Sequence, residues 1–398
     1  MRLLLIIFIT VTMMFAKSDK LSHIPPAKSI FLNIDANICD IICMEGLLNE
    51  GQIFTFLSHY NDSMDELSDM QSEYTYYERI FRIFEDENEK SSIRVAMIVP
   101  QKSIRRYAST TVNSVMAYLV SKQNNFEVKV FNSMDEQESS ILKALNDIKS
   151  ENFKYVIAPV TRDGAEVILK NADHLKVYIP TVSKSTFDDN NPNILFGGIN
   201  YDKQVDELLK YANDRVVYFS DGSELSESLN NLLIDKNPNI IYSKSINSSR
   251  VSFKKILRNN RKLVKSSIFM NTPLVKTSLI SSQLRVYRIR PYIILSTQIN
   301  YNPMLLTLTQ YADRKNFYIA NSIGKTTVEM EELNSLFGHD IVYDWVNYST
   351  SIGIDYFYTH FFVPTASKNF KEEIVDNQVA YDVSIEKPER YKFIKVLF

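Results

Sequence analysis

The chain has 398 residues, of which 45% are hydrophobic and 12% aromatic, and its formal net charge is −2. This length and apolar content suit two or three packed cores and exclude a largely disordered chain. The nearly balanced charge gives no overall attraction to nucleic acid or to an acidic membrane surface. The chain has only nine glycines and neither a GxGxxG nor a GxxxxGKS/T segment, so nucleotide binding through a glycine-rich phosphate loop is not expected.

The chain begins with a basic residue and an apolar run. Arg2 is followed by the apolar residues Leu3–Ile9, and the run continues to Ala16 before the polar segment Lys17–Lys20. This order is typical of a secretory signal peptide and predicts residues 1–16 as the signal, with cleavage after Ala16. The run is short for a membrane span, and no cysteine follows it directly. We therefore expect an exported, periplasmic protein without a lipid anchor or a transmembrane segment after cleavage.

Residues 17–90 are predicted to be an extended lead-in followed by a small helical unit. Apolar side chains recur at helical spacing from residue 37 to residue 84, and the charged segment 85–90 marks the end of this unit. Both cysteines of the chain, Cys39 and Cys43, fall near the first helix start. They are a candidate disulfide in an oxidising compartment, although a distorted turn would be needed if both lie on one helix face. The alternative is two buried thiols, and the absence of a CxxC spacing argues against a redox enzyme.

From residue 91 onward, apolar strands alternate with amphipathic helices. This alternation predicts βαβ units and parallel sheets covered on both faces, with residues 91–198 as lobe 1 and residues 199–300 as lobe 2. Residues 301–398 are predicted to return to lobe 1, with the strand Phe317–Ala320 and the helix Trp345–Phe357, and to end in a short-stranded tail. The predicted fold class is α/β: two doubly wound, Rossmann-like lobes and a small N-terminal helical unit. The predicted strands begin at Ile93, Glu127, Tyr155, Val177, Ile194, Val216, Ile240, Ser267 and Tyr292.

Several strand-turn-helix segments resemble a known family. They are Ile268–Lys276, Ser281–Leu284, Ile293–Pro303 and Ile352–Phe357. In these segments the chain resembles the type 1 periplasmic-binding fold of the branched-chain amino-acid receptors. It is more similar to the C-terminal domain of the LpoA (LppC/YraM-like) regulators of peptidoglycan synthases. The resemblance covers residues 91–360 and implies two lobes with a ligand cleft between them.

The resemblance has two departures. LpoA-like proteins are outer-membrane lipoproteins with a long helical-repeat domain at the N-terminus. This chain has no lipid-acceptor cysteine after its apolar run, and its helical region between residues 37 and 84 is far shorter. The family's reach across the periplasm depends on such an anchor and spacer.

The sequence contains no enzyme signature. There is no HExxH segment and no GxSxG segment, and the chain's histidines are scattered rather than paired at metal-ligand spacing. We therefore expect no catalytic residue, no metal and no cofactor. The five histidines are His23, His59, His174, His339 and His360.

Polar residues directly after the predicted strands are candidates for a ligand site in the cleft. Hydroxyls and backbone N–H groups at helix starts suit a carboxylate, and Arg162 suits a further one. Asp221, on the opposing lobe, suits an ammonium group. The alternative is that these residues only cap helices, because Ser, Thr and Asp are preferred at such positions. The candidates are Ser103, Thr161, Arg162, Thr181 and Ser183 in lobe 1, and Asp221, Ser223, Thr272, Thr297 and Gln298 in lobe 2.

One predicted helix, residues 252–263, has a basic outer face and a buried stripe of Phe253, Ile256 and Leu257. A solvated face is one interpretation of these cations. The other is a docking surface for an acidic protein or an anionic cell-wall polymer. The candidate partner-binding residues are Arg250, Lys254, Lys255, Arg258, Arg261 and Lys262.

These observations and the resemblance together favour a non-catalytic exported protein. The first hypothesis is an interaction or regulatory subunit in cell-envelope assembly, either similar to the peptidoglycan synthase regulators or a scaffold of an envelope machine. Its partners would be an envelope protein or peptidoglycan, and not nucleic acid. The alternative hypothesis is a solute-binding receptor for an amino acid or a similar small carboxylate.

Overall fold

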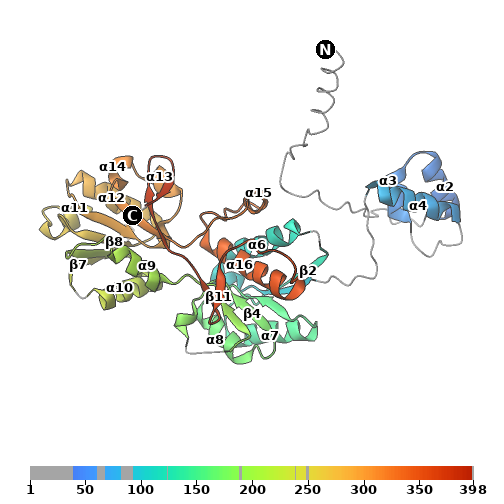
Figure 1. Ribbon diagram of the computed structural model, residues 1–398, viewed down its shortest axis with the longest axis horizontal. Helices are drawn as coiled ribbons and strands as arrows, with labels where there is room; N and C mark the ends of the chain where they lie inside the picture. Colours follow the sequence, from blue (N-terminus) through green and yellow to red (C-terminus); the bar gives the residue numbers. More distant parts are fainter. Residues whose placement is uncertain are drawn as a thin grey trace, which may run out of the picture. The chain divides into compact units, whose positions relative to one another are not determined.

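The computed structural model describes residues 39–60, 68–81, 93–122, 124–187, 191–237, 239–247 and 251–396. The chain divides into two compact units, Met1–Ser91 and Ser92–Phe398 (Figure 1). The predicted signal peptide, residues 1–16, and the lead-in that follows it lie outside the described residues. Within the described ranges, no helix is long and apolar enough to cross a membrane.

In residues 39–60 and 68–81, the described part of the N-terminal unit, three helices surround a small core. Helix α2 (Ile41–Asn49), α3 (Ile53–His59) and α4 (Ser68–Phe81) contribute apolar side chains at helical spacing. Met44 and Phe56 are fully buried in this core, and the rings of Tyr60 and Tyr74 stack with their centroids 4.1 Å apart.

A disulfide joins Cys39 to Cys43, with the two Cα atoms 5.3 Å apart. Helix α2 begins only at Ile41, and Asp40 caps it by accepting a hydrogen bond from the backbone N–H of Cys43 at 3.0 Å. Cys39 therefore precedes the helix, and the expectation that both cysteines share one helix face was wrong. Because the extended backbone at Asp40 brings Cys39 back over the first turn, the helix itself needs no distortion.

The sheet of lobe 1 has the strand order β11-β12-β5-β4-β3-β1-β2. The five strands from β5 to the edge strand β2 run parallel, and β12 continues this direction beside β5. Only β11, at the edge, is antiparallel. The bounds are β1 Ile93–Ile98, β2 Phe126–Phe131, β3 Tyr155–Ile157, β4 Lys176–Ile179, β5 Ile194–Phe196, β11 Glu373–Val375 and β12 Gln378–Ala380.

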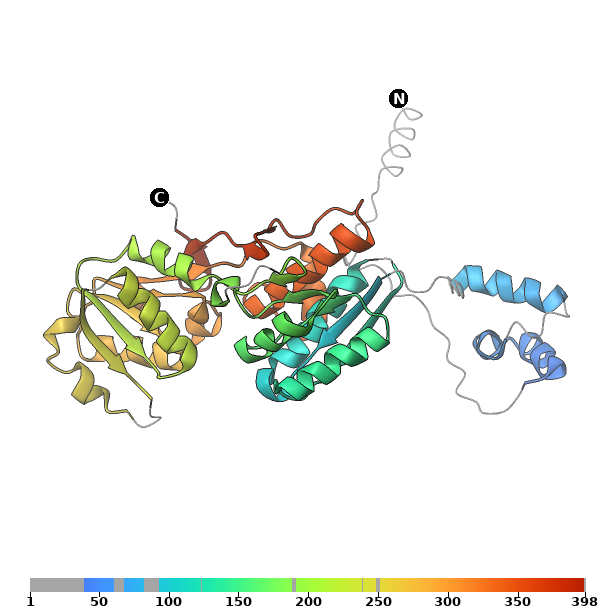
Figure 2. The same cartoon turned by 90° about the horizontal axis from the view of Figure 1, so that it is seen from below.

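Alternate residues of β1 explain why this sheet is covered on both faces. Val95 and Met97 belong to the core under α6 and α16, whereas Ala96 and Ile98 belong to the core under α7 and α8. Figure 2 shows the red helical segment and the green helices on opposite sides of the lobe 1 sheet. The helices are α5 Gln101–Ile104, α6 Tyr107–Ser121, α7 Glu138–Ser150, α8 Arg162–Asn171, η2 Lys184–Thr186, α15 Val328–Leu336, α16 Trp345–Phe357 and η5 Tyr358–Phe362.

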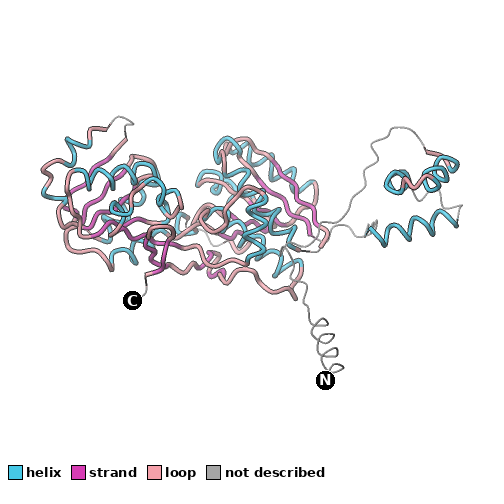
Figure 3. The backbone as a smooth tube through the Cα atoms, turned by 90° about the horizontal axis from the view of Figure 1, so that it is seen from above, coloured by secondary structure: helices cyan, strands magenta, loops and turns pink. Residues whose placement is uncertain are grey.

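The sheet of lobe 2 has the order β14-β13-β10-β9-β8-β6-β7; β13 runs antiparallel to its neighbours β10 and β14, and the other neighbouring pairs are parallel. In both lobes the strands lie between helices (Figure 3). The strands are β6 Val216–Ser220, β7 Ile240–Ser245, β8 Ser267–Asn271, β9 Ile293–Ser296, β10 Phe317–Asn321, β13 Ser384–Pro388 and β14 Phe393–Lys395. The helices are α9 Tyr201–Leu209, α10 Glu224–Lys236, α11 Phe253–Leu257, η3 Arg261–Leu263, α12 Leu274–Val286, η4 Gln298–Asn300, α13 Met304–Leu308 and α14 Tyr311–Arg314.

The chain crosses between the lobes three times, at 197–200, 322–327 and 381–383. The prediction that the strand Phe317–Ala320 returns to lobe 1 was therefore wrong, and the tail, which was assigned to neither lobe, divides between the two. Strand β10 stays in lobe 2 because it extends the parallel sheet beside β9. The tail comes back to lobe 2 as β13, which pairs with β10. Only the middle of this segment, from α15 to β12, belongs to lobe 1.

Two of the crossings are hydrogen-bonded to each other. The hydroxyl of Tyr381 donates to the carbonyl of Gly197 at 2.6 Å, and the Lys203 ammonium donates to the carbonyl of Tyr381 at 2.8 Å. Gly197 has no room for a side chain, because an added Cβ would lie 2.1 Å from the hydroxyl of Tyr178. The crossings therefore form a tight polar seam between the lobes.

The predicted helix 252–263 is interrupted. Helix α11 ends at Leu257, and the one-turn helix η3 begins at Arg261. Asn259, between them, has φ = 59°, in the left-handed region that ends a right-handed helix. Leu257 is buried as predicted, but the basic side chains lie on two short turns and not on one long helix face.

Candidate functional site

In lobe 1 the loops that follow β2 and β3 meet at the carboxyl edge of the sheet. The carboxylate of Glu136 accepts hydrogen bonds from the backbone N–H of Thr161 at 2.9 Å and of Gly164 at 3.2 Å. It also accepts one from the hydroxyl of Thr161. A helix N-terminus favours an anion, so the first turn of α8, where a solute carboxylate was expected, already holds a carboxylate of this chain.

Gln378, from β12, binds the loop after β4 in the way that Glu136 binds the loop after β3. Its side-chain oxygen accepts from the Ser183 hydroxyl at 3.2 Å and from the backbone N–H of Lys184 at 2.8 Å, and its amide donates to the carbonyl of Gly198. The hydroxyl of Thr181 donates to the carbonyl of Val160. The candidate hydroxyls of this loop are therefore engaged within lobe 1.

Two further candidates of lobe 1 are exposed. The Arg162 side chain is 59% exposed and lies 4.0 Å from Glu166. Ser103, in the short helix α5 after β1, is also exposed. These two residues offer a guanidinium and a hydroxyl at the carboxyl edge of the lobe 1 sheet.

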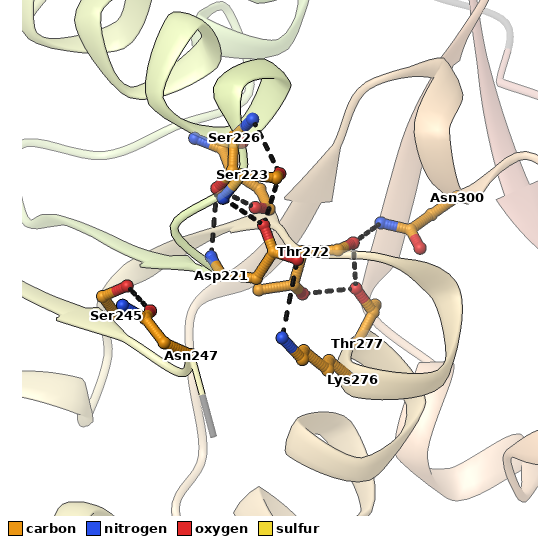
Figure 4. A network of polar contacts seen from close by, with 10 residues as sticks. Asp221, Ser223, Ser226, Ser245, Asn247, Thr272, Lys276, Thr277 and Asn300 are labelled. Carbon is orange, nitrogen blue, oxygen red and sulfur yellow. Dashed lines mark hydrogen bonds and ion pairs between the residues drawn. The ribbon is translucent and has the colours of Figure 1, made fainter. Parts of the chain in front are cut away.

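In lobe 2 the loops after β6, β7 and β8 converge around Asp221 (Figure 4). One oxygen of Asp221 accepts from the backbone N–H of Ser223 at 3.2 Å and from its hydroxyl at 2.6 Å. The other oxygen lies 3.5 Å from the ammonium of Lys276, and only 10% of the Asp221 side chain is exposed. Figure 4 also shows Ser245, the last residue of β7, and Asn247, two residues further on, beside this group.

The pKa of Asp221 lies below its usual value. Burial alone would raise this pKa, but the hydrogen bonds from Ser223 and the positive charge of Lys276 outweigh it. Asp221 is therefore an ionised carboxylate at neutral pH, held almost out of solvent at the carboxyl edge of the lobe 2 sheet.

The other lobe 2 candidates serve the lobe itself. Ser223 caps α10 by accepting from the N–H of Ser226 at 3.3 Å. Thr272 is fully buried, and its hydroxyl lies 2.7 Å from that of Thr277. Asn300 donates to the carbonyl of Thr272 at 3.1 Å.

Thr297 and Gln298 are also buried. Gln298 donates to Asn321 and accepts from Gln204 and from the backbone N–H of Ser322. Buried polar groups require such partners, and this network connects α9, η4 and the end of β10. The sequence gives no sign of it, because its members are far apart along the chain.

The residues that sequence reasoning missed are Glu136, Gln378 and Lys276. Lys276 is the third residue of α12, the helix that follows the strand ending at Asn271. Its place near the carboxyl end of that strand could therefore have been predicted from the sequence. Glu136 and Gln378 reach loops 25 and 195 residues away, and no local pattern indicates such contacts.

The candidate partner-binding residues lie elsewhere in lobe 2. Lys254, Lys255, Arg258, Arg261 and Lys262 are exposed, and Arg250 lies outside the described residues. They precede β8, and Asp221 follows β6, a parallel neighbour of β8. Lys254 and Lys255 lie in α11, between the end of β7 and the start of β8, whereas the carbonyl of Arg261 accepts a hydrogen bond from Arg215 at the start of β6, at the opposite end of that strand from Asp221. Among the described residues, no group of three or more His, Cys, Asp and Glu side chains is placed to hold a metal ion.

No family model and no curated protein matches the sequence. Solved structures do match the fold. The leucine-binding protein LivK of Thermotoga maritima matches with a TM-score of 0.54 and 14% identity, covering 77% of this chain and 98% of that one. LivJ of Streptococcus pneumoniae, a branched-chain amino acid transporter substrate-binding protein in complex with isoleucine, gives a TM-score of 0.50 and 11% identity over 76% and 99%.

The LpoA C-domain of Haemophilus influenzae, a regulator of PBP1A, gives a TM-score of 0.50 and 10% identity, covering 76% of this chain and 100% of that one. The fold is that of the type 1 periplasmic-binding proteins. This confirms the predicted fold class. The likeness to LpoA is no stronger than the likeness to the amino-acid-binding proteins, and at these identities the type 1 fold is all that the likeness establishes.

Proposed function

We propose that this protein is a non-catalytic, exported binding protein that holds a small amine-bearing solute between its lobes. The observation that carries this proposal is Asp221, an ionised and nearly buried carboxylate at the carboxyl edge of the lobe 2 sheet. Open α/β sheets bind ligands at this edge. One Asp221 oxygen pairs with the Lys276 ammonium at 3.5 Å, and a carboxylate oxygen accepts more than one hydrogen bond. An ammonium group of a solute fits that oxygen.

The class of solute follows from which polar groups of the two lobes already have hydrogen-bond partners within the protein. Glu136 occupies the start of α8, so an acid group on the solute would bind the exposed Arg162 and Ser103 instead. An amino acid or a similar small carboxylate with an amine satisfies both lobes. The many amino-acid-binding proteins among the structures with this fold support this proposal. The apolar N-terminal run supports a periplasmic location.

A thermal-shift series on the full chain tests the proposal. The probes are leucine, isopentylamine as the amine alone, and 4-methylpentanoate as the acid alone. We expect leucine and the amine to raise the Tm and the acid alone to leave it unchanged, since binding to the folded state alone stabilises it. The Asp221→Asn variant should lose both shifts, because it removes the charge and keeps the side chain's shape. Shifts that persist in this variant, or a series without any shift from an amine, would overturn the proposal.

A second candidate function is an interaction or regulatory subunit in cell-envelope assembly. Glu136 and Gln378 favour it, because they fill lobe 1 positions that a solute would otherwise contact. The likeness to the LpoA C-domain supports it as well. Its test is direct binding of the full chain to purified peptidoglycan and to a purified peptidoglycan synthase. Binding to either one that leucine does not alter would favour this function over the receptor.

A further inference from the structure

Lobe 2 contains a long stretch without any acidic residue. Residues 236–312 include thirteen Lys and Arg residues and no Asp or Glu, although the whole chain has a net charge of −2. A stretch of this charge is usually interspersed with acids when it forms an ordinary solvated surface. The fold determines whether these cations lie apart or on one surface.

The fold gathers part of them at one edge. Strands β6, β8, β9 and β10 are parallel neighbours, so their starts lie side by side about 5 Å apart. Arg215, Lys265, Arg290 and Lys315 each stand within three residues of one of these starts, and all four are exposed. The backbone N–H of Lys265 donates to the carbonyl of Arg290 at 2.9 Å, which fixes two of them as neighbours.

Two more arginines flank this row. The guanidinium of Arg215 donates to the carbonyl of Arg261 at 3.5 Å, which places η3 beside the start of β6. Arg288 follows α12 and precedes β9. We call the six residues the basic edge: Arg215, Arg261, Lys265, Arg288, Arg290 and Lys315.

The basic edge is not neutralised by the part of the chain that the structure describes. Arg285 forms an ion pair with the buried Asp313 nearby, but none of the six residues forms an ion pair with a described acid. Exposed apolar side chains lie among them: Val264 is 41%, Val286 59% and Tyr292 55% exposed. Cations without an ion pair to a described acid and exposed apolar groups thus share one surface.

We propose that the basic edge is a docking surface for an acidic protein. Arginine and tyrosine are the residue types that protein interfaces favour, and a guanidinium pairs with a carboxylate through two parallel hydrogen bonds. A protein partner also covers the exposed valines and Tyr292, which a purely ionic polymer leaves in water. The edge lies at the amino ends of the strands, about 16 Å from the carboxyl edge that holds Asp221, so a solute and this partner can bind together.

The test uses the full chain and three polyanions of matched charge: a random Glu–Tyr copolymer, poly-glutamate, and vesicles with phosphatidylglycerol. We expect the copolymer to bind most tightly and its affinity to fall as salt rises. Reversal of three cations (Arg215→Glu, Lys265→Glu, Arg290→Glu) should weaken copolymer binding by about tenfold or more. A matched control reverses three exposed lysines of lobe 1, Lys143, Lys154 and Lys170, and should leave it unchanged.

A second variant separates the apolar contribution. Val286→Ser with Tyr292→Ser should weaken copolymer binding and leave poly-glutamate binding as it was. The proposal is overturned if the three-cation reversal binds the copolymer like the unchanged chain. It is also overturned if the vesicles bind more tightly than the copolymer, since the surface would then be a lipid-binding one. Circular dichroism of each variant confirms that the fold is retained.

Discussion

At the residue scale, the start of α8 shows how one side chain decides what a site can hold. Thr161 stands at the N-cap position of α8, but its own side chain makes no capping hydrogen bond. The carboxylate of Glu136 satisfies the first backbone donors instead. The sequence identified Thr161 correctly as a residue at a helix start. It could not show that the anion for this helix is supplied by another loop.

Replacement of Glu136 tests this role. In Glu136→Gln the charge at the helix start is lost, and we expect the free energy of unfolding to fall by about 1–2 kcal/mol. Urea unfolding measures the change. Asp147→Asn removes an exposed carboxylate from α7, away from any helix start, and should change stability by less than about 0.5 kcal/mol. Equal effects of the two variants would contradict the assignment.

The lowered pKa of Asp221 predicts the pH dependence of solute binding. Hydrogen bonds and Lys276 keep the folded-state pKa below the usual value despite burial. Asp221 therefore stays ionised until the pH falls through that lowered pKa. Affinity for an alkylamine, which is protonated throughout, should be constant from pH 8 to pH 5 and decrease only in stronger acid. Calorimetric titration across this range measures it, and a midpoint between pH 5 and 8 would point to a histidine instead.

At the scale of elements, helix α16 packs so closely in lobe 1 that there is no room for a larger side chain at Gly353. An added Cβ at Gly353 would lie 2.2 Å from a ring carbon of Tyr178, and the Tyr178 hydroxyl donates to the carbonyl of Ser349 one turn earlier at 2.8 Å. Tyr118 of α6 donates to Asp355 of the same helix at 2.7 Å. The helix is thus tied both to β4 and to α6.

Gly353→Ala should therefore destabilise the larger unit. The new methyl group forces Tyr178 or α16 to shift, which costs about 1–3 kcal/mol or more. Gly46→Ala is the control, because nothing lies within 4 Å of the added Cβ there, and alanine in a helix is favoured over glycine. Thermal unfolding followed by calorimetry should show a lower Tm for Gly353→Ala only. A Tm unchanged by Gly353→Ala would mean that the close contact relaxes without cost.

Most helices and strands were predictable from the spacing of their apolar residues. The lobe to which each one belongs was harder to predict. A buried strand of β10's length looks the same whichever sheet it joins, and only its pairing with β9 decides. The early end of α11 depends on the left-handed Asn259, although asparagine at such a position is a recognisable signal. Among the site candidates, the sequence indicated Asp221 but not that Thr272 and Gln298 are consumed by a buried network.

At the scale of the whole larger unit, an aromatic cluster joins the two lobes. Tyr343, in the loop between α15 and α16 of lobe 1, packs on Tyr301 and Phe393 of lobe 2 with ring centroids 5.1 Å and 5.8 Å away. Such ring pairs contribute about 0.5–1.5 kcal/mol beyond their buried area. The cluster therefore restrains the angle between the lobes.

Removal of this ring should loosen the lobes. For Tyr343→Ala we expect a larger radius of gyration in small-angle X-ray scattering without the solute, because fewer contacts oppose opening. Tyr391→Ala removes an 89% exposed ring of lobe 2 and should leave the scattering curve unchanged. A scattering curve for Tyr343→Ala that superposes on that of the unchanged chain would show that the crossings alone set the angle.

The three crossings have a consequence for how the chain matures. Strands β1 to β5 of lobe 1 are complete early in synthesis, but α16, which covers Val95 and Met97, follows only after β10 of lobe 2. During synthesis the part of this sheet face that α16 covers therefore stays exposed, although α6, which covers the rest of it, is made directly after β1. The sheet of lobe 2 is likewise complete only when β13 and β14, at the end of the chain, have been made. Neither lobe has all of its elements until the chain is nearly complete, so we expect both to reach the native state late and a holding chaperone to protect the apolar surface that α16 later covers.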